Sequence, residues 1–470
     1  MRSSLGIHSV LFILLALIIP QATHAEDPVD VQGRRELFVD DYLIASMSDG
    51  VSLQVQQPEP REVVLVTDEP WEGNTSAYYT ILQDQDAEGH DLFRMYYRGS
   101  HAINMKSAHE EVTCYAESTD GRRWNKPRLG LFDWHGTKEN NIVWRGIGTH
   151  CFTPFIDTNP DCPPEARFKA ISRGRPVGKK GLYTFASADG IHWSQTSDEP
   201  VITQGAFDSQ NLAFWDPVLE QYVTYSRLFT NGVRAIQRST SDDFENWSAP
   251  ITLTYGEAPN QHLYTNAIRP CPGAPHLRIG FPTRYLPQSQ QVEPIFMASR
   301  DGLMFRRYDS AVIPQTAPQD RAGNRSNYMA HGLLSLPDFP DEWSVYGTEA
   351  YYEGPDSRLR RFVYRKDGLV ALSGSGTVTT KPLHTRSSTL RLNYETHSGG
   401  SLDVNVLDAD RQVNQAAKLV AARDDSTSDA IFSWESRSTE TAEQTIRLQF
   451  TLKNASLYAL QFDVANRDSQ

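Results

Sequence analysis

The sequence predicts an all-β protein, a five-bladed β-propeller followed by a C-terminal β-sandwich. Its apolar runs are short, rich in β-branched and aromatic residues, and bounded by Gly, Pro, Asn or Asp, whereas helical periodicity is almost absent. One turn motif recurs along most of the chain. After about Ser373 the motif stops and alternating strands follow, which indicates a second domain.

The N-terminus has the pattern of a secretory signal peptide. A positive charge at Arg2 precedes an apolar run over 10–19, and small residues end at Ala25. The run is too short to span a bilayer comfortably, so we expect cleavage rather than an uncleaved membrane anchor. We predict a signal peptide over 1–25 and an exported protein, periplasmic or secreted, with no membrane partner after signal removal.

The acidic charge and the few cysteines of the chain indicate which kinds of ligand it is not expected to bind. The net charge of −13 is spread along the chain, which disfavours binding to nucleic-acid phosphates and to anionic lipids. The cysteines match no zinc-ligand spacing; they are Cys114, Cys151, Cys162 and Cys271. A disulfide between Cys151 and Cys162 could close a short loop, and structural or free buried thiols are the alternative that we favour.

The recurring turn divides the chain into repeats. It reads Ser-x-Asp-Gly-x-x-aromatic at 118–124, 187–193 and 299–305, with a degenerate copy at 241–247 and a fainter one at 365–370. The acidic positions lie about 50 to 70 residues apart, which is the spacing of propeller blades. Asp-Gly makes a tight hairpin turn because Gly accepts a positive φ, and the aromatic residue can pack between blades. Five copies predict five blades; coincidental Asp-Gly turns in another β protein are the alternative.

The repeats place the propeller over 26–372 and leave 373–470 for the sandwich. Gly, Ser and Thr fill the stretch 373–380. The alternating strands lie at 389–393, 402–407, 445–451 and 457–462. This domain could bind carbohydrate, as accessory sandwiches of carbohydrate-active enzymes do, but we favour a structural brace against the propeller.

The turn motif also resembles that of known enzymes. It is similar to the turns of five-bladed propeller glycosidases of the invertase and arabinanase–xylosidase type, and more loosely to the Asp-boxes of sialidases. Longer phrases resemble exported glycosyl-hydrolase-like proteins of planctomycetes and related bacteria, at 37–44, 70–73, 96–99, 205–211, 262–267 and 367–369. The resemblance implies the fold and a glycosidase. The invertase phrases Asn-Asp-Pro-Asn-Gly and Arg-Asp-Pro are missing, so fructosidase activity is not implied.

Polar phrases occupy the places where the innermost strand of each blade should begin. They lie at 71–74, 154–157, 207–211, 262–266 and 324–328. Glycoside hydrolysis needs two carboxyl groups, and a third often keeps the pKa of the acid high. We predict Glu72 and Asp208 as the catalytic pair and Asp157 as the third carboxylate. Which one is the acid stays open, and turn capping or backbone bonding is the alternative for each.

Other acidic residues are weaker candidates. Asp40 and Asp41 could supply the acid, but their setting in 37–44 favours an outer strand that closes the last blade. Glu349 and Glu353 lie in a stretch that alternates like an ordinary strand.

Arginine and aromatic side chains are expected to hold the substrate. The predicted substrate-binding residues are Asn74, Arg98, Asn211, His262, Tyr264, Arg284 and Arg325. Arginine forks suit carboxylate or sulfate groups, so an anionic sugar is the sharper hypothesis, with structural salt bridges as the alternative. No cofactor or metal is expected, and an axial divalent cation stays an open alternative.

The sequence therefore predicts a glycoside hydrolase that acts on a poly- or oligosaccharide, with an anionic sugar as one option. A non-catalytic propeller that binds glycans or a protein partner through the same channel is the alternative. The repeat pattern alone does not choose between them, because propellers host many functions.

Overall fold

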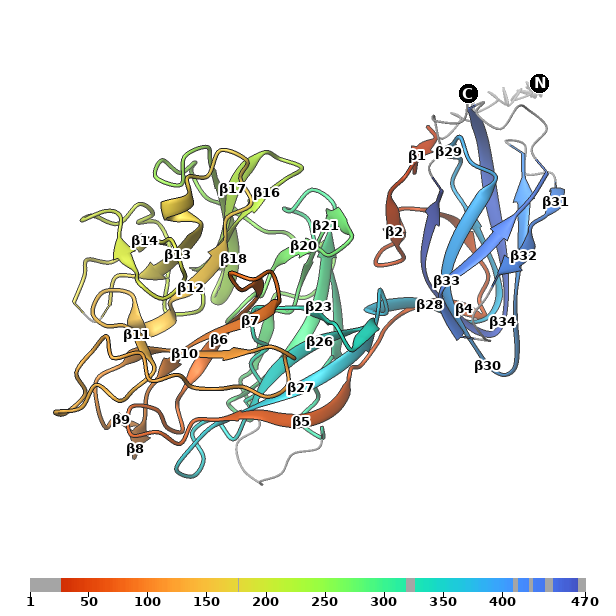
Figure 1. Cartoon of the computed structure of the whole chain (residues 1–470). Coiled ribbons are helices and arrows are strands. Elements are labelled where there is room, and N and C mark those ends of the chain that lie inside the picture. The colour runs from red at the N-terminus through yellow and green to blue at the C-terminus, as the bar shows by residue number, and fades with distance from the viewer. Residues whose placement is uncertain are drawn as a thin grey trace, which may run out of the picture.

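The computed structural model describes residues 27–175, 177–317, 326–408, 413–421, 426–435 and 443–463. The predicted signal peptide over 1–25 lies outside these ranges. Apart from two short 3-10 turns, η1 (Thr149–Cys151) and η2 (Pro164–Ala166), the regular structure of the described residues is β. No helix in these ranges is long and apolar enough to cross a membrane. Figure 1 shows a ring of small sheets beside a β-sandwich.

Five sheets around one axis form the predicted propeller. Blade 1 contains β6 (Ala77–Gln85), β7 (Asp91–Gly99), β10 (Val112–Ser118) and β11 (Ile142–Trp144). Blade 2 contains β12 (Thr153–Ile156), β13 (Phe168–Arg173), β14 (Leu182–Ser187) and β15 (Ser194–Gln195). Blade 3 contains β16 (Leu212–Asp216), β17 (Gln221–Thr230), β18 (Val233–Ser241) and β19 (Ile251–Thr252).

Blades 4 and 5 complete the ring. Blade 4 contains β20 (Arg269–Cys271), β21 (Ala274–Gly280), β22 (Thr283–Leu286), β23 (Gln291–Ser299) and β24 (Arg306–Ala311). Blade 5 contains β25 (Leu334–Leu336), β26 (Phe339–Glu349), β27 (Arg358–Arg365) and β5 (Glu59–Val66). In each blade the strand named first lies at the axis. In blade 5 this strand is β25, and the outermost strand is β5. A small hairpin, β8 (Ala102–Ile103) and β9 (Lys106–Ser107), extends from blade 1.

The outer strand of blade 5 comes from the opposite end of the propeller sequence. β5 pairs antiparallel with β27, with Val66 opposite Arg358 and Glu59 opposite Val363. No hairpin is therefore needed after β27, and the faint fifth motif at 365–370 is not a blade turn. The chain instead leaves the propeller there and enters the sandwich.

The Asp-Gly turns have one geometry. At the second copy, the Asp189 carboxylate accepts hydrogen bonds from the backbone amides of Ile191 and His192, both at 2.8 Å. The Gly190 amide donates to the Ser187 hydroxyl at 2.9 Å, and Gly190 has a φ of +77°. A carboxylate that accepts two amides fixes the turn without help from the rest of the fold.

These turns also join neighbouring blades, as predicted. Tyr96 of blade 1 donates a hydrogen bond to the Gly190 carbonyl of blade 2 at 2.8 Å, and its ring meets Trp193 edge-on at 6.1 Å. Two other blade junctions repeat the hydrogen bond. Their pairs are Tyr225 with Gly302 at 2.9 Å and Tyr346 with Gly121 at 2.7 Å.

The sandwich is built from both ends of the described chain. Its N-terminal strands are β1 (Val29–Asp30), β2 (Arg35–Leu37), β3 (Ile44–Met47) and β4 (Val51–Val55). Its C-terminal strands are β28 (Val370–Thr380), β29 (Leu383–Thr385), β30 (Thr389–Leu407), β31 (Val413–Ala416), β32 (Lys418–Ala421), β33 (Ser426–Ser433) and β34 (Gln444–Phe462). The predicted start of the propeller at residue 26 is therefore wrong, because β1 to β4 belong to the sandwich, whereas the predicted change at 372/373 lies near the start of β28 at Val370. The N-terminal segment pairs with strands more than 300 residues away, and local pattern cannot reveal such pairing.

The predicted position of 37–44 in the last blade is also wrong, because this stretch lies at the interface between the two domains. Arg300 of blade 4 donates to Glu36 at 2.9 Å and to Asp40 at 2.8 Å. Burial alone would raise the pKa of Glu36, but its hydrogen bond with His276 and the charge of Arg300 hold it at about 2. Asp40 is thus a structural residue, and the sandwich braces the propeller.

The cysteines are all free thiols, so Cys151 and Cys162 do not form the short-loop disulfide. Cys114, Cys151 and Cys271 are buried in the propeller. Burial raises the pKa of each of these three thiols, which keeps them protonated and unreactive.

We expect Gly190→Ala to lower the melting temperature through the blade junction. A Cβ at this position would lie 2.6 Å from the Tyr96 hydroxyl, in addition to the strain of a positive φ. Gly130→Ala is the matched control, because its φ of +72° is similar and nothing lies within 4 Å of its Cβ. Thermal denaturation should show a further loss of about 1–3 kcal/mol for Gly190→Ala. Equal losses in both variants would contradict the role of this junction.

Candidate functional site

A cavity of about 810 Å³ lies at the channel mouth where the inner strands begin. Residues that precede or start the inner strands line it together with residues from the ends of the second strands. They include Tyr78, Arg98, His150, Asp208, Arg227, Arg234, Tyr264, Tyr328, Tyr351 and Glu353. The second strand of each blade runs antiparallel to the first, so its end reaches the same mouth. All five blades contribute to this site.

Three arginines occupy corresponding positions on the second strands of blades 1 to 3. Arg98, Arg173 and Arg227 lie at or near the ends of β7, β13 and β17, and all three are buried. The Arg98 guanidinium donates to the Thr75 carbonyl at 2.6 Å and lies 4.8 Å from the centre of the Tyr78 ring. Backbone and ring contacts hold the Arg98 guanidinium in place at the cavity.

Asp208 is the carboxylate at the centre of this cluster. Its side chain is 63% exposed toward the cavity, forms an ion pair with Arg173 and lies 3.1 Å from His150 Nε2. The hydrogen bond with His150, together with the charges of Arg173 and Arg227, holds the pKa of Asp208 well below its usual range. Asp208 is therefore ionised at neutral and mildly acidic pH, and it can act as a base, a nucleophile or an electrostatic partner but not as an acid.

His150 connects two carboxylates. Its Nδ1 lies 2.9 Å from Glu111, and Glu111 lies 3.5 Å from Arg98. Burial would raise the pKa of Glu111, but the hydrogen bond with His150 and the charge of Arg98 lower it. His150 thus links Asp208 to Glu111 and, through it, to Arg98, and these contacts fix the orientation of Asp208.

Tyrosine rings form much of the remaining wall. Tyr264 packs against Tyr285 at 5.3 Å, and the Arg234 guanidinium lies 4.5 Å from the Tyr264 ring centre. Tyr328 meets Tyr351 edge-on at 5.5 Å. Burial raises the pKa of Tyr328, so its hydroxyl stays protonated and can donate a hydrogen bond. Flat apolar faces with hydroxyl groups at their edges suit polar ring ligands.

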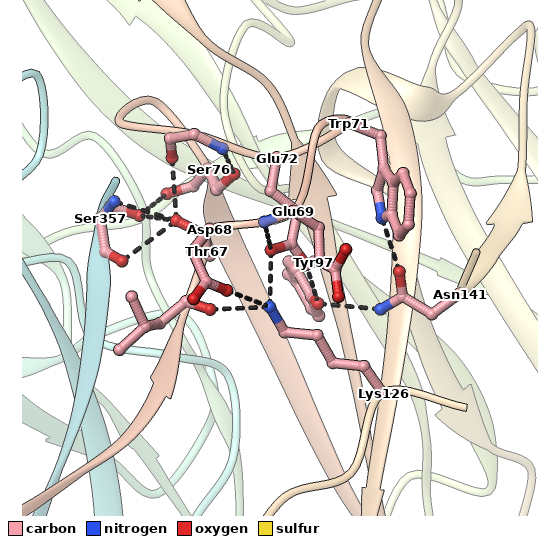
Figure 2. Close-up of polar contacts among 12 residues, drawn as sticks. Thr67, Asp68, Glu69, Trp71, Glu72, Ser76, Tyr97, Lys126, Asn141 and Ser357 are labelled. Atoms are coloured by element: carbon pink, nitrogen blue, oxygen red, sulfur yellow. Dashed lines mark hydrogen bonds and ion pairs between the residues drawn. The ribbon is translucent and has the colours of Figure 1, made fainter. Parts of the chain in front are cut away.

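Glu72 does not lie in this cavity, which corrects its predicted catalytic role. Figure 2 shows it enclosed by Lys126 and Tyr97. The ammonium group of Lys126 lies 2.6 Å from the carboxylate, and the Tyr97 hydroxyl donates to it at 2.5 Å. Burial raises the pKa of Glu72, and the Lys126 charge opposes that shift. The turn before β6 directs this side chain between strands rather than into the channel.

Asp157 is also removed from the cavity. It follows the end of β12, whereas His150 precedes the start of that strand. An extended strand advances roughly 3.3 Å per residue, which carries Asp157 toward the other mouth. Its side chain is fully buried in an ion pair with Lys169 and accepts a hydrogen bond from Tyr222 at 2.7 Å. Of the three predicted catalytic carboxylates, the structure brings only Asp208 to the cavity.

The predicted substrate-binding residues divide in the same way. Arg98 and Tyr264 line the cavity, whereas Arg325 lies outside the described residues. Arg284 instead forms an ion pair with Glu293 at 2.5 Å and is absent from the lining.

The other three predicted residues organise backbone near the cavity. The Asn74 side chain accepts a hydrogen bond from the Ala102 amide at 3.0 Å and donates one to the Ala102 carbonyl at 3.2 Å. Asn211 donates to the Phe207 carbonyl at 3.0 Å and thereby shapes the loop that presents Asp208. His262 Nδ1 accepts from the backbone amide of Arg234 at 3.2 Å.

The sequence contained a signal for Arg173 and Arg227, which were not predicted, in their correspondence with the predicted Arg98. Arg98, Arg173 and Arg227 follow Tyr97, Ser172 and Ser226 at corresponding points of three successive repeats. Aligning the second strands rather than the first would have found them. His150 had no such local signal, because it lies in η1 between two blades.

Glu353 is a second carboxylate of the cavity lining, whereas Glu349 forms a buried ion pair with Arg360 at 2.5 Å. Among the described residues, one trio of potential metal ligands is close enough to share an ion. It consists of Asp86, Glu88 and His90, in the turn between β6 and β7. The axial-cation alternative therefore has no ligand trio in the described part of the channel.

Comparison with known proteins gives the following likenesses. No family model and no curated protein matches the sequence. Among solved structures, the chain is similar to an N-acetylgalactosamine deacetylase from F. plautii in complex with blood group B trisaccharide, with 12% identity over 68% of this chain and 96% of that one, and a TM-score of 0.46. It is also similar to a GH32 β-fructofuranosidase from Bombyx mori, with 8% identity over 87% and 94%, and a TM-score of 0.41.

A third likeness is to an endo-arabinase from Bacteroides thetaiotaomicron, with 9% identity over 66% of this chain and 99% of that one, and a TM-score of 0.42. Two of these three neighbours are named as a fructofuranosidase and an arabinase, and the third as a deacetylase. At such identities and TM-scores the likenesses say nothing about the activity of this chain.

We expect Lys126→Met to destabilise the protein by about 3 kcal/mol, because it leaves the buried Glu72 carboxylate without its cation. Without Lys126, burial holds the pKa of Glu72 further above its unfolded value of about 4.5, so the folded state binds a proton more tightly. The loss should therefore be larger at pH 8 than at pH 5 in urea denaturation. Lys138→Met, at an exposed lysine, is the control. A loss independent of pH would contradict this account of Glu72.

Proposed function

We propose that the cavity at the channel mouth binds an anionic carbohydrate. The observation that carries this proposal is the set of three guanidinium groups that line one cavity, on Arg98, Arg227 and Arg234. A fourth, on Arg173, forms an ion pair with Asp208 of the same lining. The three lining arginines outnumber the two lining carboxylates, those of Asp208 and Glu353, although the whole chain has a net charge of −13. A positive cavity in an acidic protein attracts anionic ligands, and arginine forks match carboxylate or sulfate groups.

The tyrosines support a sugar rather than a simple inorganic anion. The faces of Tyr264 and Tyr285 offer stacking area, and their hydroxyls offer hydrogen bonds. The cavity volume of about 810 Å³ is within the range of small-molecule sites and can take more than one sugar ring.

We further propose that the reaction is glycoside hydrolysis. Two carboxylates from different blades, Asp208 and Glu353, line the cavity, and this reaction needs two. Asp208 is the ionised partner, acting as nucleophile or base, because His150 and Arg173 keep it deprotonated. Glu353 is assigned the acid role, in which it protonates the leaving oxygen.

Glycan binding without cleavage is the second candidate function. It is favoured by the burial of Glu72 and Asp157 in ion pairs outside the cavity. It is also favoured by the ion pairs of Asp208, since a carboxylate held by cations is a weak base.

The binding proposal predicts that Arg227→Gln weakens affinity for uronic-acid or sulfated oligosaccharides by about tenfold or more, because one charge-assisted contact is lost. Affinity for neutral oligosaccharides of the same length should stay unchanged. Isothermal titration calorimetry at low and high salt measures both. Arg123→Gln, at an exposed arginine of the first Asp-Gly turn, is the control. A preference for neutral sugars in the wild-type protein would overturn the anionic assignment.

The hydrolysis proposal predicts that Asp208→Asn and Glu353→Gln each lower kcat by about a hundredfold or more on a substrate found by screening anionic polysaccharides. Reducing-end release measures turnover, and Glu88→Gln on an exposed turn is the control. Activity that survives Asp208→Asn would show that the catalytic assignment is wrong. A glycan that binds at the cavity and is never cleaved would favour the second candidate.

A further inference from the structure

The opposite mouth of the channel contains a second hollow, of about 470 Å³. Residues from the second half of β6, the ends of β12 and β16, the length of β20 and the start of β25 line it. It shares no lining residue with the cavity that contains Asp208. The two hollows are therefore separate sites at the two ends of one channel.

The walls of this second hollow are mostly apolar. Phe155, Phe214 and Trp215 contribute aromatic rings, and Leu333 and Leu334 contribute aliphatic side chains. Phe155, Phe214 and both leucines are buried, whereas Trp215 is half-buried. Such walls suit an apolar body of a small ligand.

His331 supplies a polar group within these apolar walls. It is 7% exposed and lines the hollow, and apart from a weak contact with the Ile268 carbonyl its ring nitrogens have no hydrogen-bond partner among the described residues. Burial lowers the pKa of His331 to about 3, with the Arg269 charge adding to the shift and the Ile268 carbonyl opposing it. The ring is therefore neutral and offers one donor and one acceptor. A buried ring nitrogen without a partner is costly, so a ligand that forms a hydrogen bond with it is stabilised.

Arg269 lies in the same wall and brings a positive charge. Its Nη1 donates to the Leu333 carbonyl at 3.2 Å, and its buried Nε has no partner among the described residues. No acidic residue belongs to the described lining of this hollow, and no described carboxylate forms an ion pair with Arg269. An enclosed guanidinium without a counter-charge favours an anionic ligand.

We propose that this hollow is a binding site for a small organic carboxylate with an apolar, ring-sized body. The carboxylate lies against Arg269, and His331 forms a hydrogen bond with the same ligand. The apolar body packs against Trp215 and Leu333. Apolar walls with a single cationic anchor fit this ligand class better than a sugar, whose many hydroxyl groups would find few partners here. The inference does not depend on the function proposed for the first cavity.

Sodium benzoate is a suitable probe, with benzyl alcohol and sodium acetate as matched comparisons. Benzyl alcohol keeps the ring without the charge, and acetate keeps the charge without the ring. Titration calorimetry on the whole protein should give an affinity for benzoate at least about tenfold tighter than for either comparison. Arg269→Gln should remove the preference for benzoate over benzyl alcohol.

Three further measurements keep the test decisive. Benzoate should shift the ring-nitrogen resonances of His331, and this readout uses the wild-type protein if Arg269→Gln fails to fold. Trp215→Phe should abolish the fluorescence response to benzoate while the calorimetric affinity changes less than about threefold. Arg227→Gln, in the other cavity, should leave benzoate affinity unchanged. The proposal is overturned if benzoate binds no tighter than benzyl alcohol, if it leaves the His331 resonances unmoved, or if Arg227→Gln abolishes its binding.

Discussion

The pairing of β5 with β27 is the interaction on which the rest of this structure depends. It joins the first and last parts of the propeller sequence and so closes the ring. Closure brings blade 5 against blade 1, where Thr80 and His331 form a bridge and Tyr78 contacts Tyr328 at 6.1 Å. Without it the five inner strands would not share an axis, and neither hollow would have a complete wall.

The sandwich reinforces this closure. The chain enters the propeller from β4 and leaves it into β28, and these two strands pair with each other, with Val55 opposite Val370. Entry and exit are therefore held together on both sides of the domain boundary. The ion pairs of Arg300 with Glu36 and Asp40 attach the sandwich to blade 4. The sandwich, which resembles an accessory domain, thus helps to keep the propeller ring closed.

The two mouths of the channel differ in polarity, because opposite ends of the inner strands reach them. The inner strands begin where Asp208 and Tyr264 face a polar, positively charged cavity, and β12 and β16 end among the mostly apolar walls of the second hollow. A few residues along one strand decide which mouth a side chain reaches. His150 and Asp157 flank the same short strand, yet one contacts Asp208 and the other forms a buried pair with Lys169.

The sequence by itself determined the all-β class, the spacing of the blades and the form of the Asp-Gly turns, because a turn is fixed by its own few residues. It also identified Asp208, Arg98 and Tyr264, which lie where strand ends reach the cavity. Only the tertiary structure decided that β1 to β4 belong to the sandwich and that β5 completes blade 5. It alone placed Glu72 against Lys126 and assembled the arginine cluster. Strand partners and side-chain neighbours in a closed ring come from distant parts of the chain, and local pattern does not encode their pairing.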